Sequence, residues 1–202
     1  MKLYYSPGAC SLSPHIVARE AGIPIELIKV NLAAGKTEDG GDYRQINPKG
    51  YVPLLTLDNG ERLSEGPAIV QYIADQASAK NLAPANGSMA RYRLQEWLNF
   101  ITSELHKGFS ILFNKAMPEE AKTVARAKLG ERFGWINQQL EGKTFLMGDN
   151  FTVADAYLFT VAGWGKLVGV DISSFSTLGA YLGRIAARPA VKEALKAEGL
   201  VK

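Results

Sequence analysis

The chain contains a single cysteine, Cys10, at a position where a thiol can do chemistry. It follows a short apolar run and precedes Ser13-Pro14, a capping residue and a first-turn proline that are typical of a helix start. Because the N–H groups at a helix start favour a thiolate, we expect the pKa of Cys10 to lie below the roughly 8.5 of a free cysteine. Without a second cysteine, the thiol can form a mixed disulfide only with an external thiol, or can hydrogen-bond to a bound one. The alternative is that Cys10 is a small, inert, buried residue.

A second candidate group is the pair Glu65-Gly66, which stands at the start of another predicted helix. Free N–H groups at a helix start bind carboxylates, and Glu65 can pair with an ammonium group. A ligand that carries both charges on one carbon, such as an amino-acid α-centre, would fit this pair. The alternative is that Glu65 is a solvated surface carboxylate.

A third group lies on one long predicted helix. Four polar residues are spaced at i, i+4, i+7 and i+8, which would place them on one face of an α-helix: Asn99, Ser103, His106 and Lys107. His106 is one of two histidines in the chain, and it could donate a hydrogen bond to a thiolate near neutral pH. A solvated polar face is the alternative reading of the same spacing.

The first eighty residues alternate between short strands and helices. Apolar runs predict four strands, at residues 3–5, 25–30, 54–57 and 62–64. A helix is predicted to start at Ser13 and end at Gly22, and Asn59-Gly60 predicts a type I′ turn between the last two strands. Residues 31–47 are expected to be irregular, with room for one short helix. The order β-α-β, link, β-β-α is that of a thioredoxin-like domain, which we place at residues 1–78.

In this order of elements, Val52-Pro53 directly precedes the third strand and is a candidate for binding a ligand. In a thioredoxin-like domain the proline before the third strand is expected to be cis, which turns the N–H and C=O groups of Val52 outward. A short extended peptide can then pair with both groups as an added strand. The alternative is an ordinary proline at the start of a strand.

The rest of the chain is predicted to be helical. Residues 77–86 have the composition of a linker, and apolar spacing predicts helices at 88–113, 118–140, 152–167 and 175–187, with a short piece after Pro189. Thr152 and Asp155 have the spacing of a capping box, and we expect them to be structural. The predicted fold class is therefore α/β plus all-α, with a helical bundle domain at residues 87–202.

Charge and composition argue against several kinds of protein. The net charge is +3 at pH 7 and no run of five like charges occurs, which argues against a nucleic-acid or polybasic membrane partner. No apolar run approaches the roughly 18 residues of a membrane span, and the first residues lack the apolar stretch of a secretory signal. We therefore expect a cytoplasmic location. A single cysteine also argues against a cysteine-based zinc site, and we expect neither a metal nor a cofactor.

Five motifs along the whole chain resemble those of the glutathione transferases, and closely those of the bacterial beta class. They occur in the family's order, as KLYYSPGACSL at 2–12, NPKGYVP at 47–53, LSEG at 63–66, ELHKGF at 104–109 and FTVADAYL at 151–158. The resemblance implies a homodimeric detoxification enzyme that conjugates its co-substrate, glutathione, to small apolar electrophiles. It also implies mixed-disulfide (thiol transferase) chemistry at the cysteine.

The resemblance also assigns roles to single positions. Cys10 matches the family's thiol, and Val52 matches the residue whose backbone pairs with the cysteinyl unit of glutathione. Glu65 and Gly66 match the γ-glutamyl site. The helix positions that reach the tripeptide in the family correspond here to Asn99, Ser103 and His106.

Two positions depart from the family's pattern. Many relatives have a serine where this chain has Gly66, so one hydroxyl is missing. Relatives often have a lysine at position 35, whereas this chain has Gly35 followed by Lys36, which becomes the candidate for binding the glycyl carboxylate. Tyr5 and Ser11 lie near the places where other classes carry hydroxyls that orient the thiolate.

Four side chains are thus candidates to activate the thiol of glutathione, and the sequence does not choose among them: Cys10, His106, Tyr5 and Ser11. The electrophile pocket, to which the helical domain contributes, is expected to lie between the domains, with candidate wall residues Tyr5, Phe109, Phe113 and Trp164. The alternative for each of these aromatic residues is packing in the core. Two other functions remain open at this point. One is a glutathione-dependent disulfide reductase with Cys10 as nucleophile, and the other is a non-enzymatic protein that binds glutathione adducts.

Overall fold

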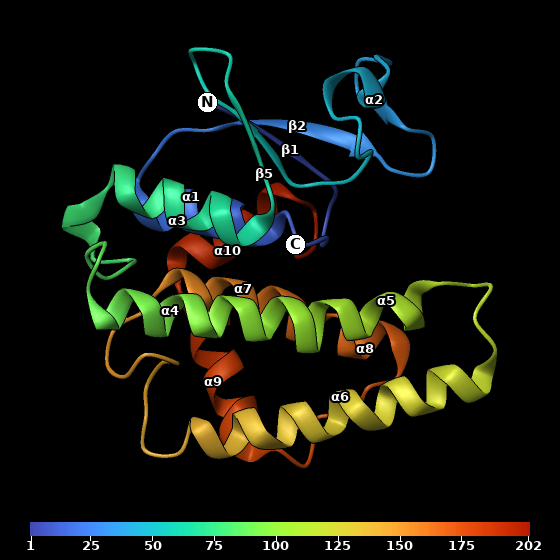
Figure 1. Cartoon of the computed structure of the whole chain (residues 1–202), viewed down its shortest axis with the longest axis vertical. Helices are drawn as coiled ribbons and strands as arrows, with labels where there is room; N and C mark the ends of the chain where they lie inside the picture. Colours follow the sequence, from blue (N-terminus) through green and yellow to red (C-terminus); the bar gives the residue numbers. More distant parts are fainter. The chain divides into compact units, whose positions relative to one another are not determined.

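The computed structural model describes all residues, 1–202, and the chain folds into two compact units. The first unit contains Met1–Leu82 together with Arg188–Lys202, and the second contains Ala83–Ala187 (Figure 1). The sequence places everything after residue 87 in one helical domain. The C-terminal segment differs from that expectation, because helix α10 (Pro189–Ala197) packs against helix α1 (Leu12–Ala21) of the first unit.

The first unit is built on a mixed sheet with the strand order β3-β2-β1-β4-β5. β1 pairs in parallel with β2 and antiparallel with β4, while β2–β3 and β4–β5 are antiparallel pairs. The strands are β1 (Lys2–Tyr5), β2 (Glu26–Asn31), β3 (Lys36–Thr37), β4 (Leu54–Thr56) and β5 (Arg62–Ser64). The other helical elements of this unit are α2 (Tyr43–Ile46), α3 (Gly66–Gln76) and a 3₁₀ turn at Ser78–Lys80. The predicted thioredoxin-like order of elements is confirmed.

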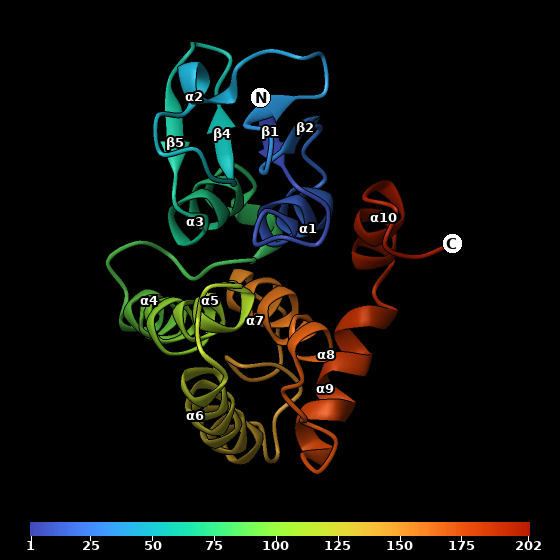
Figure 2. The ribbon, with the colours of Figure 1, turned by 90° about the vertical axis from the view of Figure 1, so that its right-hand side faces the viewer.

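Helices α1 and α3 pack side by side against one face of the sheet (Figure 2). Their inward side chains are fully buried together with strand residues, and this set forms the core of the unit: Leu3, Ile16, Leu55, Ile69 and Ile73. Helix α1 ends at Gly22, whose φ of 69° is the left-handed conformation that glycine adopts readily at a helix end. This end was predicted, whereas the start of α1 lies at Leu12 rather than at Ser13, and strand β3 was not expected at all.

The hairpin between β4 and β5 turns differently from the prediction. A type I′ turn at Asn59-Gly60 requires positive φ at both residues, and only Gly60 has it, with φ 87°. The N–H of Gly60 donates to Leu57 O at 3.0 Å, and the N–H of Leu57 donates to Glu61 O at 2.8 Å. The loop is therefore one residue longer, with Gly60 in the left-handed position that a three-residue hairpin loop needs.

The second unit is entirely helical, as predicted. It contains α4 (Met89–Phe100), α5 (Lys107–Phe113), α6 (Glu119–Gln139), α7 (Val153–Gly163), α8 (Gly165–Val168) and α9 (Ser176–Ala187). Between α4 and α5, the residues Ile101–His106 form a π-helical segment, in which the N–H of Lys107 donates to Thr102 O. The predicted helix at 88–113 therefore contains one wide turn, a feature that is frequent at functional sites. None of the helices combines the length and the apolar character needed to cross a bilayer.

Helix α7 is buried along most of its length and starts with the predicted capping box of Thr152 and Asp155. The carboxylate of Asp155 is fully buried and accepts four hydrogen bonds. Two come from main-chain N–H groups, of Leu146 at 2.9 Å and of Thr152 at 2.7 Å. The other two come from the hydroxyls of Thr152 at 2.9 Å and of Tyr181 at 2.8 Å. Burial raises the pKa of Asp155, and these donors oppose the rise. Asp155 thus joins α7 to the preceding loop and to α9.

We expect Asp155→Ala to lower the free energy of unfolding by about 3 kcal/mol or more, because it leaves several buried donors without an acceptor. Asp149, an exposed aspartate of the same loop region, provides the matched control, and Asp149→Ala should change stability by less than about 0.5 kcal/mol. Urea unfolding of both variants at pH 7 measures the difference. Equal midpoints for the two variants would contradict the assigned role of Asp155.

Candidate active site

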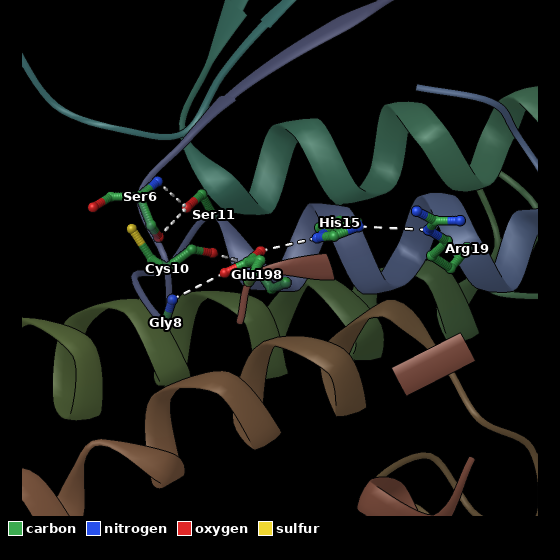
Figure 3. Close-up of polar contacts among 8 residues, drawn as sticks. Ser6, Gly8, Cys10, Ser11, His15, Arg19 and Glu198 are labelled. Carbon is green, nitrogen blue, oxygen red and sulfur yellow. Dashed lines mark hydrogen bonds and ion pairs between the residues drawn. The ribbon is translucent and has the colours of Figure 1, made fainter. Parts of the chain in front are cut away.

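The loop between β1 and α1 carries Cys10 and is fixed by short polar contacts (Figure 3). The fully buried Ser11 hydroxyl donates to Ser6 O at 3.2 Å and accepts from the N–H of Ser6 at 3.1 Å. The N–H of Gly8, a residue with φ 71°, donates to the carboxylate of Glu198 at 2.9 Å. Since the hydroxyl proton of Ser11 goes to Ser6, the side chain holds the loop in shape, and its role in activating a thiol stays a prediction.

The carboxylate of Glu198 is itself part of a buried chain of polar groups (Figure 3). Its Oε1 lies 2.9 Å from His15 Nδ1, and both side chains are fully buried. Arg19 Nε–H donates to His15 Nε2 at 3.5 Å, so Nδ1–H is the donor of the imidazole toward Glu198. Through Gly8, this chain of contacts ties the C-terminal segment and α1 to the loop that carries Cys10.

The thiol of Cys10 donates to the main-chain oxygen of Val52, with 3.2 Å between Sγ and O. Burial raises the pKa of Cys10 to about 11, while the N–H groups of Cys10 and Ser11 lower it and the charge of Glu65 raises it further. The expectation that the helix start gives Cys10 a low pKa is therefore wrong. The N–H groups act in the predicted direction, but the loss of water around the thiolate outweighs them.

We expect the rate of Cys10 alkylation by iodoacetamide to rise about tenfold per pH unit between pH 7 and 10 and to level off only near pH 11. The physical reason is that the thiolate reacts, and a pKa of about 11 keeps Cys10 protonated below that pH. Mass spectrometry of the protein at timed intervals gives the rate. A plateau below pH 8 would instead support the low pKa predicted from the helix start.

The peptide bond between Val52 and Pro53 is cis, as the sequence predicts. The turn before it is held by the Asn47 side-chain amide, which donates to Tyr51 O at 2.7 Å, and by the Tyr43 hydroxyl, which donates to the same oxygen at 3.0 Å. Val52 is almost fully buried, its C=O accepts from Cys10, and its N–H makes no hydrogen bond within the chain. The N–H of Val52 is therefore a donor that a bound peptide can use.

Glu65 stands at the start of α3 in a sparsely populated backbone conformation, with φ 70° and ψ 114°. Such a conformation in a residue other than glycine is costly and is concentrated at functional sites. The C=O of Glu65 accepts from the N–H groups of Ala68 and Ile69, both at 3.0 Å, whereas the N–H of Gly66 has no partner within the chain. The Glu65 carboxylate is 64% exposed and pairs with Lys49 Nζ at 2.8 Å. The position thus offers one carboxylate and one N–H donor side by side.

The other predicted residues lie in the second unit, on the π-helical segment and next to it. Asn99 and Ser103 are exposed, and the Ser103 hydroxyl donates to Asn99 O at 3.0 Å. His106 Nδ1 lies 2.7 Å from the hydroxyl of Tyr157, and its ring packs edge-on against Trp164 at a centroid distance of 4.9 Å. The predicted spacing i, i+4, i+7 assumes 3.6 residues per turn, whereas Ser103 and His106 lie in the π-helical segment. That these residues share one face with Asn99 stays a prediction.

The remaining candidates occupy three different environments. Tyr5 is buried at the end of β1, where burial, then the charges of Glu198 and Glu38, raise the pKa of its phenol. Lys36 is exposed on β3. The candidate wall residues of the second unit form an aromatic cluster with centroid distances of 5.6 to 6.4 Å: Phe109, Phe113 and Trp164.

No group of three or more His, Cys, Asp or Glu side chains is arranged to hold a metal ion.

Two partners of the site residues were missed from the sequence. Tyr157 lies within the motif at 151–158, but nothing in the motif links it to His106, which is 51 positions away. Glu198 lies near the C-terminus, and no spacing signal connects it with Gly8 or His15. Both contacts join distant parts of the chain, which a local pattern cannot reveal.

Comparison with known proteins decides the family. Residues 8–76 match the family profile "Glutathione S-transferase, N-terminal domain", and residues 100–189 match the profile "Glutathione S-transferase, C-terminal domain". The chain belongs to the glutathione S-transferase family.

Three relatives illustrate the similarity. Glutathione S-transferase GstA of Escherichia coli O157:H7 is 46% identical over 200 residues, which cover 99% of this chain and 100% of that protein. The solved ternary complex of BphK, a bacterial glutathione transferase, has a TM-score of 0.97 at 58% identity and covers 98% of this chain and 100% of that one. A sphingomonad glutathione S-transferase in complex with glutathione has a TM-score of 0.96 at 52% identity, with both chains fully covered. These relatives identify the chain as a glutathione transferase enzyme.

The two glutathione transferase profiles include most of the predicted site residues. The N-terminal profile includes Cys10, Val52, Glu65 and Gly66, and the C-terminal profile includes Ser103 and His106. The thioredoxin-like and helical units therefore correspond to the two parts of the glutathione transferase fold.

Proposed function

We propose that the protein conjugates glutathione to small apolar electrophiles, as a cytoplasmic homodimer of the bacterial beta class that acts in detoxification. The observation that supports this most directly is the arrangement of backbone donors and charge in the first unit. The N–H groups of Val52 and Gly66 lack partners within the chain, and the Glu65 carboxylate stands beside Gly66. These groups match the peptide backbone and the zwitterionic end of a γ-glutamyl tripeptide.

In this proposal, glutathione lies extended along Val52 and pairs with its N–H and C=O groups as an added strand. The γ-glutamyl ammonium pairs with Glu65, and the adjacent carboxylate accepts from the N–H of Gly66. The cysteinyl sulfur then lies near Cys10, because Cys10 Sγ is 3.2 Å from Val52 O. Asn99, Ser103 and His106 are proposed as further contacts, with Tyr157 orienting the imidazole, and Lys36 as the contact for the glycyl carboxylate.

The chemical step needs the thiolate of glutathione as the nucleophile. It attacks the electrophilic carbon, the carbon–sulfur bond forms, and the leaving group departs with the bonding electrons. A Cys10 pKa of about 11 means that Cys10 is a neutral thiol at pH 7, able to donate a weak hydrogen bond to that thiolate. His106 and Tyr5 remain candidates for the same task.

Mixed-disulfide chemistry is the second part of the proposal. The thiolate of Cys10 attacks the disulfide of oxidised glutathione, one glutathione leaves as a thiolate, and an external thiol later reverses the step. Because the pKa of Cys10 is about 11, this route is slow at neutral pH.

We expect glutathione to bind, and Glu65→Gln to weaken that binding by about 1.5–3 kcal/mol, the usual range for a hydrogen bond to a charged group. Glutamine keeps the size and shape of the side chain, so the substitution removes the negative charge and exchanges one acceptor oxygen for an NH2 donor. Calorimetric titration measures both affinities, and Glu61→Gln, an exposed glutamate of the same hairpin, is the control. Absence of binding at millimolar glutathione would overturn the proposed function, and equal affinity of Glu65→Gln would move the γ-glutamyl group elsewhere.

A second expectation separates the two activities. Cys10→Ala should abolish exchange with oxidised glutathione but retain roughly a tenth or more of aryl-halide conjugation, because conjugation loses only one weak hydrogen bond. Cys10→Ser, which keeps a donor at this position, should retain more of the conjugation rate. Paired rate measurements on both variants test this. Complete loss of both activities in Cys10→Ala would show that Cys10 is required for conjugation as well.

A further inference from the structure

Lys49 makes a contact that neither the motifs nor the relatives assign. Its Nζ donates to Glu65 Oε1 at 2.8 Å and to Ser64 Oγ at 3.0 Å. An ammonium group has three N–H donors, and only these two are used within the chain. The third donor is available beside the start of α3.

The position of Lys49 is fixed by the turn that leads into Val52. The N–H of Lys49 donates to the Asn47 side-chain oxygen at 3.2 Å, and the N–H of Gly50 donates to Asn47 O at 2.9 Å. Gly50 has φ 74°, a conformation that favours glycine. The same turn therefore determines both the backbone conformation at Val52 and the direction in which the Lys49 side chain extends.

The start of α3 is poor in donors for an anion. Pro67 has no N–H, the N–H groups of Ala68 and Ile69 donate to Glu65 O, and Gly66 has no side chain. Only the N–H of Gly66 remains. A carboxylate offers about four acceptor positions, so one bound here by Gly66 alone would be under-satisfied.

We propose that Lys49 is a specificity-determining residue that donates its third N–H to the α-carboxylate of the γ-glutamyl group. This inference rests on the proposed function. Lys49 bridges Glu65 and the ligand, so the zwitterionic end meets an ordered pair of opposite charges instead of a lone carboxylate. A γ-glutamyl peptide is thereby distinguished from a peptide that carries only an amine at the same place.

Two properties of Lys49 agree with this role. The hydrogen bond and the negative charge of Glu65 raise the pKa of Lys49, so the group stays an ammonium at neutral pH. The pair is well exposed, with 47% of the Lys49 side chain and 64% of the Glu65 side chain accessible, and exposed pairs contribute little to stability. Replacing Lys49 should therefore leave the fold intact.

The experiment compares Lys49→Met with Lys2→Met. Lys2 also forms an exposed ion pair, with Glu26 at 3.2 Å and with side-chain exposures of 51% and 54%, so the control makes the same change in charge. Each variant is titrated with glutathione and with 4-aminobutyryl-cysteinyl-glycine, which lacks only the α-carboxylate. We expect Lys49→Met to weaken glutathione binding roughly tenfold and to change affinity for the analogue less than about twofold. Lys2→Met should bind both ligands like the unmodified protein.

A rescue adds a second line of evidence. A Cβ at Gly66 would meet only Pro53 Cγ, at 3.9 Å, so Gly66→Ser fits and adds a hydroxyl donor at the helix start. In the Gly66→Ser background, Lys49→Met should cost less affinity for glutathione than it does in the unmodified protein.

The outcomes separate this inference from the proposed function. If the unmodified protein binds glutathione and Lys49→Met binds it equally well, the role of Lys49 is overturned and the proposed function stands. An equal loss for glutathione and for the analogue would also overturn it, because Lys49 would then act only through Glu65. If the unmodified protein does not bind glutathione, the proposed function fails, and the role of Lys49 fails with it.

Discussion

The buried carboxylate of Glu198 is the contact on which the arrangement of the Cys10 loop depends. A buried carboxyl group is tolerated only when it has hydrogen-bond partners, and here the partners are Gly8 N–H and the His15 imidazole. The loop between β1 and α1 lies outside the sheet, and this carboxylate and the Ser6–Ser11 pair stabilise its backbone turns. Together with the packing of α10 against α1, this contact holds the C-terminal segment in the first unit, so a truncation there removes support from the thiol as well as a helix.

The environment of Cys10 results from two opposing effects of the same fold. The start of α1 brings N–H groups to the sulfur, which stabilises a thiolate, and the packing around the loop removes water, which destabilises it. The second effect is larger, so the thiol keeps its proton and donates a hydrogen bond to the carbonyl oxygen of Val52. A thiol next to a helix start is therefore no guarantee of a reactive cysteine, since the degree of burial decides the sign of the shift.

Local patterns predicted most of the fold but little of the network that supports the site. The end of α1 at Gly22, the cis bond at Pro53 and the capping box at Asp155 follow from residue chemistry within a few positions. The π-helical segment could not be predicted, because its sequence is compatible with a regular α-helix. The contacts of Glu198 and Tyr157 depend on tertiary packing between residues far apart in sequence.

The donors and acceptors around Val52 and α3 are unequally used, and this inequality bears on which ligands the first unit favours. The oxygen acceptors in this region already accept hydrogen bonds from within the chain. Cys10 donates to the carbonyl oxygen of Val52, and Lys49 donates to the carboxylate of Glu65. The N–H groups of Val52 and Gly66 have no acceptor in the chain. A ligand gains most where it supplies acceptors, because its own donors must displace or share an existing hydrogen bond. A peptide with a free carboxylate at its end meets this condition better than an amine alone, and the third donor of Lys49 strengthens the preference in the same direction.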